Sequence, residues 1–184
     1  MRCRSLTYSK QASSMLIFLV GYAGSGKSSL GKRLARRLGV RFVDTDREVE
    51  LSEGASVADI FHYGGEEYFR KSERVTVERL ANEGVDLVVA TGGGLPTWQD
   101  NMEWMTRSGM TVYLRRSPEQ ILLRLTEYGR EKRPMFRGKS DEELLEFMCQ
   151  QMAERERFYA MAHIAVDCTT MSDDDVVEAI VNKL

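Results

Sequence analysis

Short apolar runs alternate with longer amphipathic stretches along the 184 residues of this chain. Five of the runs have the length and composition of buried strands, and they span residues 16–20, 41–43, 87–90, 111–114 and 163–166. The stretches between them repeat apolar residues at helical spacing, and several begin at a serine followed three residues later by Asp, Gln or Glu, a helix-capping arrangement. The alternation predicts an α/β fold with a doubly wound, five-stranded parallel sheet and helices on both faces. Ligands of such sheets bind beyond the carboxyl ends of the strands, so the residues that follow each strand are the candidates for function.

The first strand leads into a glycine-rich segment, Gly21 to Ser28, which matches the phosphate-loop pattern G-x-x-x-x-G-K-[ST]. Its glycines allow consecutive backbone N–H groups to point inward, and the N-terminus of the following helix adds partial positive charge where a polyphosphate would lie. We expect Lys27 to reach the β- and γ-phosphates of ATP and the Ser28 hydroxyl to ligate Mg²⁺. The residues assigned to the nucleotide are Gly21, Gly24, Ser25, Gly26, Lys27, Ser28 and Ser29.

Two carboxylates, Asp44 and Asp46, follow the second strand. Phosphoryl transfer needs one carboxylate that helps to hold Mg²⁺, directly or through water, and a second that orients or deprotonates the attacking hydroxyl. Two aspartates spaced i and i+2 could divide these tasks, although Asp46 alone could be the N-cap of a helix that begins near Arg47. Thr91 to Gly94 follow the third strand, and three glycines at this place suit the close approach of a small ligand to backbone N–H groups.

Three arginines could serve a small anionic substrate. Arg70 and Glu73 share one face of a long helix, either as a surface ion pair or with Glu73 fixing an arginine that points into the pocket. Arg133 lies in residues 127–139, a segment rich in charge and glycine that has the composition of a mobile lid, and a lid arginine can neutralise a transferring phosphoryl group. Arg155 lies on a later helix with an aromatic residue one turn away. Each of these side chains alone is more often a solvated surface residue.

Composition limits the classes of partner. The net charge is −2, from 26 basic and 28 acidic residues that form no blocks, which argues against a general nucleic-acid or membrane-surface partner. No apolar run approaches the ~18 residues that cross a bilayer. The three cysteines are scattered without metal-ligand spacing, as expected of reduced thiols in a cytoplasmic protein. We expect a monomer with a tail over residues 1–14 and one domain over 15–184, in which about 46–84 form a helical, substrate-binding insertion and about 127–139 the lid.

Taken in order, these motifs resemble those of the shikimate kinase family. The likeness runs from about residue 16 to the C-terminus, and it is carried by the phosphate loop, Asp44-Thr-Asp46, Gly65-Glu66-x-x-Phe69-Arg70-x-x-Glu73, Thr91-Gly-Gly-Gly94, Arg133-Pro134 and Arg155-x-x-x-Tyr159. The phosphate loop alone would indicate only a P-loop protein, whereas the joint set is highly specific. The resemblance implies a P-loop kinase, similar in architecture to nucleoside monophosphate kinases, that transfers the γ-phosphoryl group of ATP to the 3-hydroxyl of shikimate. The product would be shikimate 3-phosphate, an intermediate of aromatic amino acid biosynthesis.

The resemblance assigns roles on the nucleotide side by matching position. It implies that Lys27 serves the phosphates, that Ser28 ligates Mg²⁺ and that Asp44 assists the metal. The resemblance also implies an arginine that stacks on adenine. A difference of two residues in loop length leaves two candidates for it, Arg124 as first choice and Arg130 as second.

The resemblance also assigns roles to residues on the acceptor side. Asp46 would hold the hydroxyls of shikimate and act as the base, Arg70 and Arg155 would grip its carboxylate, and Arg133 would close from the lid. Arg157 stands where the family usually has a proline, which predicts that the helix carrying Arg155 is unbroken. The residues assigned to the acceptor are Asp46, Arg70, Gly92, Gly93, Gly94, Arg133 and Arg155. Two guanidinium groups match the need of a small carboxylate for oriented, charge-assisted binding.

Two other functions fit part of the pattern. One is another small-molecule kinase of the same architecture, such as a gluconate or nucleoside monophosphate kinase. Phe69-Arg70-x-x-Glu73 and the triple glycine argue against this function, because the resemblance ties them to shikimate. The other is a module that binds nucleotide without catalysis. Such a module predicts the loss of at least one catalytic position, whereas Lys27, Ser28 and Arg133 are all present, as is Asp46.

Overall fold

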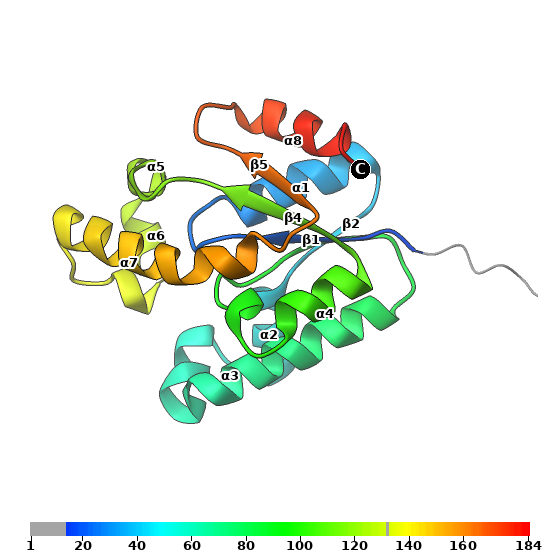
Figure 1. The fold of residues 1–184 in the computed structure, drawn as a ribbon. Coiled ribbons are helices and arrows are strands. Elements are labelled where there is room, and N and C mark those ends of the chain that lie inside the picture. Colours follow the sequence, from blue (N-terminus) through cyan, green and yellow to red (C-terminus); the bar gives the residue numbers. More distant parts are fainter. Residues whose placement is uncertain (1–13, 132) are drawn as a thin grey trace, which may run out of the picture.

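The computed structural model describes residues 14–131 and 133–184, and its centre is a five-stranded sheet in the order β2-β3-β1-β4-β5 (Figure 1). All neighbouring strands are parallel. The strands are β1 (Leu16–Val20), β2 (Arg41–Asp44), β3 (Leu87–Ala90), β4 (Met110–Arg115) and β5 (Ile164–Asp167). The predicted fold class is confirmed, with β5 beginning one residue later than expected. Because the chain crosses from β3 to β4 over β1, the order reverses at β1, and the crevice beyond its carboxyl end is where ligands bind in such sheets.

The side chains of β1 alternate between two apolar cores, one on each face of the sheet. Ile17 and Leu19 pack with residues of α1 (Lys27–Leu38) and α8 (Asp173–Val181). Phe18 and Val20 belong to the opposite core, to which α3 (Val57–Asn82), α4 (Asn101–Ser108) and α7 (Asp141–Tyr159) contribute. Figure 1 shows α1 and α8 on one side of the sheet and α3 and α4 on the other. Each fully buried side chain of this size stabilises the fold by about 1.5–3 kcal/mol, so β1 is held from both faces.

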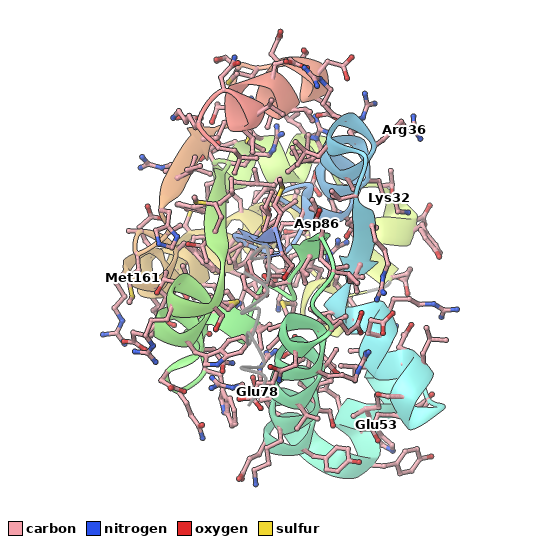
Figure 2. The ribbon with its side chains drawn as sticks, turned by 90° about the vertical axis from the view of Figure 1, so that its right-hand side faces the viewer. Lys32, Arg36, Glu53, Glu78, Asp86 and Met161 are labelled. Carbon is pink, nitrogen blue, oxygen red and sulfur yellow. The ribbon has the colours of Figure 1, made fainter. Side chains whose placement is uncertain are left out.

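The helix α1 shows how the sequence pattern positions the phosphate loop. Leu30 and Leu34 are buried, whereas Lys32 and Arg36 are exposed and point outward (Figure 2). The apolar stripe fixes the helix on the sheet, so its N-terminus lies beside the end of β1. Of the helices in the part of the chain that the structure describes, none is long and apolar enough to cross a membrane.

Two helices separate β2 from β3, α2 (Thr45–Glu53) and α3. The helix α3 is kinked at Gly65, where φ is 77°. The alternative that Asp46 caps a helix near Arg47 is wrong. The helix begins at Thr45, and its N-cap is Asp44, whose carboxylate accepts the backbone N–H of Asp46. That these helices form a substrate-binding insertion stays a prediction.

Short helices also lie in the connections that follow β3 and β4. They comprise η1 (Leu95–Thr97), α5 (Pro118–Arg124), α6 (Glu127–Glu131) and η2 (Pro134–Phe136). The predicted capping by serines is confirmed, since the N-caps of α3, α5, α7 and α8 are Ser56, Ser117, Ser140 and Ser172. The mobility of the segment 127–139 and the domain bounds stay predictions, and the expected tail falls on residues 1–13, outside the described residues, apart from Ser14.

Candidate active site

The phosphate loop has a backbone that only glycines adopt without strain. Gly21, Gly24 and Gly26 have φ of 141°, 84° and 98°. A Cβ atom on Gly24 would lie 2.8 Å from the side chain of Ile121, so this glycine also lets α5 approach the loop. Gly26 is the N-cap of α1, and no side chain caps this helix. Its first N–H groups are therefore available to an anion.

Lys27 folds back over the loop that it follows. Its Nζ donates to the carbonyl oxygens of Gly21 (2.7 Å) and Tyr22 (2.8 Å), and the residue is 7% exposed. Burial lowers the pKa of Lys27 to about 8, and the nearby Asp46 opposes this shift. The ammonium group is thus bonded to neutral carbonyl oxygens and is positioned to exchange them for phosphate oxygens.

Beside the loop lies a cavity of about 300 Å³ that is lined by Gly24, by the predicted nucleotide residues from Gly26 to Ser29 and by both aspartates, whereas Gly21 and Ser25 do not line it. In it, Ser28 Oγ donates to Asp44 Oδ2 at 2.5 Å. These are hard oxygen ligands of the kind that Mg²⁺ prefers, and this ion takes only one or two protein ligands when phosphates and water complete its shell. The described residues contain no group of three or more His, Cys, Asp or Glu that could hold a metal by themselves. The Ser28–Asp44 pair fits a nucleotide-bound Mg²⁺ rather than an all-protein metal site.

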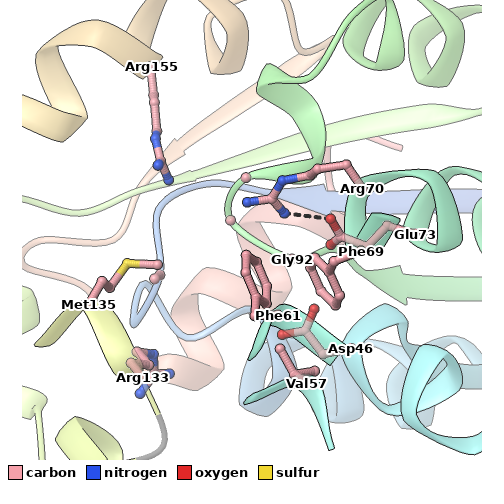
Figure 3. Close-up of a pocket in the computed structure, with 13 residues that line it drawn as sticks. Asp46, Val57, Phe61, Phe69, Arg70, Glu73, Gly92, Arg133, Met135 and Arg155 are labelled. Carbon is pink, nitrogen blue, oxygen red and sulfur yellow. Dashed lines mark hydrogen bonds and ion pairs between the residues drawn. The ribbon is translucent and has the colours of Figure 1, made fainter. Parts of the chain in front are cut away.

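A second cavity, of about 350 Å³, lies next to the first (Figure 3). We call it the acceptor cavity because all the residues predicted to bind the acceptor line it. One wall is apolar and consists of Val57, Phe61 and Phe69. Figure 3 shows Arg70 and Arg155 reaching it from different elements, α3 and α7. The remaining lining residues are Ala23, Asp46, Glu73, Gly92, Gly93, Gly94, Arg133 and Met135. A small molecule with both an apolar face and an anionic group would be complementary to these walls.

Arg70 and Glu73 form a buried pair, not a surface one. Arg70 is 8% exposed and Glu73 fully buried, with Arg70 Nη1 donating to Glu73 Oε2 at 2.5 Å and Nη2 donating to Glu66 at 3.1 Å. The other carboxylate oxygen of Glu73 has no hydrogen-bond partner among the described residues. Burial raises the pKa of Glu73 to about 8, although the charge of Arg70 opposes the rise. Glu73 therefore positions the guanidinium while favouring its own neutral form, which leaves the positive charge of Arg70 available.

The three glycines after β3 make room for side chains of the site. A Cβ on Gly92 would clash with Glu73 and would lie 2.8 Å from Asp46 Oδ1, and one on Gly94 would clash with the guanidinium of Arg70. A Cβ on Gly93 would lie 2.9 Å from the backbone nitrogen of Ala23 in the phosphate loop. All three glycines also line the acceptor cavity, so the expected approach of a ligand stays a prediction beside this packing role.

Arg155 and Arg133 approach the acceptor cavity without a carboxylate partner among the described residues. Arg155 Nη2 donates to the amide oxygen of Gln151 at 2.6 Å, and its guanidinium lies 5.6 Å from the ring centroid of Tyr22. Arg133 Nη1 donates to the carbonyl oxygen of Gly129 at 2.6 Å. Burial lowers the pKa of Arg133. The helix α7 continues unbroken through Arg157 to its end, as predicted.

Asp46 and Arg133 belong to both cavities, together with Ala23, Gly92 and Gly93. Burial raises the pKa of Asp46 to about 6, with a further contribution from the charge of Asp44. A carboxylate of this kind is a stronger base than an exposed aspartate and is still ionised at neutral pH. The structure thus places one candidate base and one candidate cation on the common wall of the two cavities.

The two arginines considered for adenine lie in different surroundings. Arg124 forms an ion pair with Asp173 (3.1 Å) and lines a third cavity of about 270 Å³, which touches the phosphate loop at Gly24. Arg130 instead forms an ion pair with Asp141 and does not line that cavity. The geometry therefore suits the first choice, and the stacking role stays a prediction.

Sequence reasoning missed Tyr22 and the apolar wall of the acceptor cavity. The ring of Tyr22 is in contact range of two groups, with its centroid 5.6 Å from the guanidinium of Arg155 and 6.4 Å from the ring centroid of Phe136. Tyr22 occupies a variable position of the phosphate-loop pattern, so nothing in the motif indicates it. Val57 and Phe61 precede the kink of α3 and Arg70 follows it, so only the tertiary structure brings these side chains to one cavity.

A phosphate loop at the switch point of a doubly wound parallel sheet, with an acceptor cavity against it, defines a P-loop kinase. Comparison with known proteins identifies the family within the class of P-loop kinases. The shikimate kinase family model matches residues 23–184, so the chain belongs to the shikimate kinase family. A shikimate kinase from Parabacteroides distasonis is 42% identical over 91% of this chain and 96% of that protein. The chain is therefore an ATP-dependent kinase, a phosphotransferase.

Solved structures agree with the sequence relatives. A shikimate kinase from Bacteroides thetaiotaomicron has a TM-score of 0.84 at 35% identity, covering 92% of this chain and 99% of that one. A shikimate kinase from Acinetobacter baumannii in complex with shikimate has a TM-score of 0.82 at 32% identity, with 93% of each chain covered. These comparisons do not favour the alternatives of a gluconate kinase, a nucleoside monophosphate kinase or a non-catalytic module.

Proposed function

We propose that this chain transfers the γ-phosphoryl group of ATP to the 3-hydroxyl of shikimate, giving ADP and shikimate 3-phosphate. The observation that carries the proposal is the wall shared by the two cavities. Asp46 and Arg133 face both the loop that would hold the polyphosphate and the cavity that would hold the acceptor. Phosphoryl transfer requires the attacking and leaving oxygens to lie on opposite sides of one phosphorus atom, as two adjoining cavities allow.

On the donor side, the free N–H groups at the N-terminus of α1 and the ammonium of Lys27 bind the phosphates. Ser28 and Asp44 would hold Mg²⁺, which when bound would neutralise negative charge on the phosphates. Arg124 contacts the adenine from the third cavity. Lys27 gives up its bonds to the loop carbonyls and follows the negative charge that develops during transfer.

On the acceptor side, Arg70 and Arg155 bind the carboxylate of shikimate from two directions, which fixes the ring in the cavity. The backbone of Gly92 to Gly94 adds contacts, and the wall that includes Phe61 covers the apolar edge of the ring. Asp46 accepts a hydrogen bond from the reacting hydroxyl and takes its proton as the new P–O bond forms. Arg133 neutralises the transferring group from the side of the lid.

The remaining expectations belong to the same proposal. The enzyme acts as a cytoplasmic monomer on ATP and shikimate, with no nucleic-acid or membrane partner. Residues 15–184 form its domain, in which about 46–84 bind the substrate and about 127–139 close over it.

A coupled assay of ADP formation tests the proposal with shikimate, gluconate and nucleoside monophosphates as separate acceptors. We expect turnover with shikimate alone, loss of turnover when Mg²⁺ is chelated, and recovery when it is restored. Phosphorus and proton NMR of the product then identify the phosphorylated carbon. Strong turnover with gluconate or a nucleoside monophosphate, or phosphate on another hydroxyl of shikimate, would contradict the proposal.

A further inference from the structure

The strand β4 ends at the first of two consecutive arginines, of which one is exposed and the other buried. Arg115 ends the strand with a side chain that is 62% exposed and lies 4.0 Å from Glu156. Arg116 is only 2% exposed. Its nearest hydrogen-bond acceptor is the backbone of the phosphate loop, since Arg116 Nε donates to the carbonyl oxygen of Ser25 at 3.3 Å.

Among the described residues, Arg116 is a buried charge without a direct ion-pair partner. Its Nη2 has no hydrogen-bond partner among the described residues, and within the described ranges no carboxylate lies within ion-pair distance of it. Burial lowers the pKa of Arg116, and the charge of Arg124 lowers it further, while the more distant carboxylates of Asp173 and Asp167 oppose this shift only in part. Arginine nevertheless keeps its proton in proteins. An uncompensated buried charge is costly, and an apolar side chain of similar volume would often be no less stable.

The carbonyl group that Arg116 holds belongs to a peptide unit of the phosphate cradle. The peptide between Ser25 and Gly26 is trans and planar, so its C=O and its N–H point in opposite directions. With the oxygen directed at Arg116, the Gly26 N–H is directed the other way. Gly26 lines the phosphate-loop cavity, and among the described residues its N–H donates to no protein group.

We propose that Arg116 is a positioning residue for the nucleotide. It orients the Ser25–Gly26 peptide so that the Gly26 N–H faces the phosphates, and its charge, which no direct ion pair neutralises, attracts the polyphosphate from behind the loop. The bound anion in turn offsets the cost of the buried guanidinium. Arg116 is thereby coupled to the phosphates of the nucleotide and not to its base or to the acceptor.

The test compares Arg116→Met with Arg115→Met, which removes the same charge from the neighbouring residue. The dissociation constant of ADP with Mg²⁺ in excess is measured by calorimetry, and KM is measured for ATP and for the acceptor. We expect Arg116→Met to raise the ADP dissociation constant and the KM for ATP about fivefold, the scale of a charge acting on a polyphosphate through protein of intermediate dielectric. The KM for the acceptor and all constants of Arg115→Met should stay within twofold of wild type.

Thermal unfolding separates this role from a purely structural one. Without nucleotide, Arg116→Met should unfold at the wild-type temperature or above it, because an uncompensated charge has been replaced by an apolar chain. The rise in unfolding temperature on adding ADP should be smaller than in wild type. Arg116→Lys should bind ADP more tightly than Arg116→Met because it keeps the charge.

Each outcome of these experiments distinguishes a nucleotide-positioning role of Arg116 from a purely structural one. An ADP dissociation constant unchanged in Arg116→Met, or an equal loss of acceptor binding, overturns the proposal. A lowered unfolding temperature with an unchanged ADP effect assigns Arg116 a structural role only. If Arg116→Met does not fold, equal ADP binding by Arg116→Gln and Arg116→Lys overturns the proposal, and weaker binding by Arg116→Gln supports it. Because Arg116 acts through the phosphate loop, its role rests on the proposed function, which fails instead if wild-type protein does not bind ADP.

Discussion

Replacing Glu73 with glutamine should stabilise the protein at alkaline pH, although it removes one member of a buried ion pair. Burial raises the pKa of Glu73 from 4.5 to about 8 in the folded protein. Between these two values the folded protein therefore binds more protons than the unfolded chain. The free energy of unfolding must then fall as the pH rises through this window, because the unfolded state releases the proton first.

The magnitude follows from the size of the shift. One pKa unit corresponds to about 1.4 kcal/mol, so the full shift would give a loss of about 5 kcal/mol between pH 4.5 and 8. Glutamine resembles the protonated glutamate and can still accept the hydrogen bond from Arg70, but it has no proton to lose. We expect Glu73→Gln to match wild type in stability near pH 5 and to exceed it by about 2–5 kcal/mol near pH 9.

Urea unfolding at pH 5, 7 and 9 measures this difference, with tryptophan fluorescence as the signal. Trp104 suits the purpose, since its ring lies 6.1 Å from that of Phe18 in the core. Glu66→Gln is the matched control, because Glu66 also pairs with Arg70 but its side chain is 69% exposed, and an exposed pair contributes little. Parallel pH profiles for wild type and Glu73→Gln, or a variant less stable at every pH, would show that Glu73 is ionised in the folded protein and would refute the reasoning.

Three further substitutions test the proposed roles by steady-state kinetics and calorimetry. Asp46→Asn should lower kcat by at least about 100-fold, the scale of general-base catalysis, and leave the ADP dissociation constant within threefold; near-normal turnover would remove Asp46 from the role of base. Arg155→Met should raise the KM for shikimate at least tenfold, since a hydrogen bond to a charged group contributes about 1.5–3 kcal/mol. The exposed Arg157 on the same helix gives the control, and an equal effect of Arg157→Met would indicate helix disruption instead. Arg133→Met should lower kcat by about 100-fold with less than threefold change in shikimate binding, whereas a change in KM alone would make Arg133 a binding residue only.

The fold and the donor side of the site could be predicted because their signals are local. Each strand is a short apolar run, and the phosphate loop is one continuous motif whose glycines need positive φ wherever it occurs. The carboxylates after β2 follow from the rule that parallel strands end at the same edge. These features depend on neighbours in the sequence and hardly on the partners that tertiary packing supplies.

The parts that could not be predicted depend on which side chains meet. The glycines after β3 were expected to admit a ligand, yet their lack of Cβ atoms also admits Glu73, Arg70 and the backbone of the phosphate loop. Arg115 and Arg116 are the same residue type at adjacent positions, and only the packing of β4 against the loop exposes one and buries the other. A sequence pattern gives the type of each residue, whereas its protonation state and its freedom to bind a ligand depend on the side chains that pack around it.

The cations around the two cavities differ from those of the rest of the surface in what they bind. Surface arginines such as Arg33, Arg41 and Arg79 form ion pairs with carboxylates. Around the cavities, by contrast, neutral oxygens accept the hydrogen bonds of Lys27, Arg116, Arg133 and Arg155. Arg70 is paired, but with a carboxyl group whose neutral form is favoured by burial. An entering anion therefore need not displace a carboxylate from Lys27, Arg116, Arg133 or Arg155. A chain with a net charge of −2 can thus have a local positive potential that suits both a polyphosphate and a carboxylate.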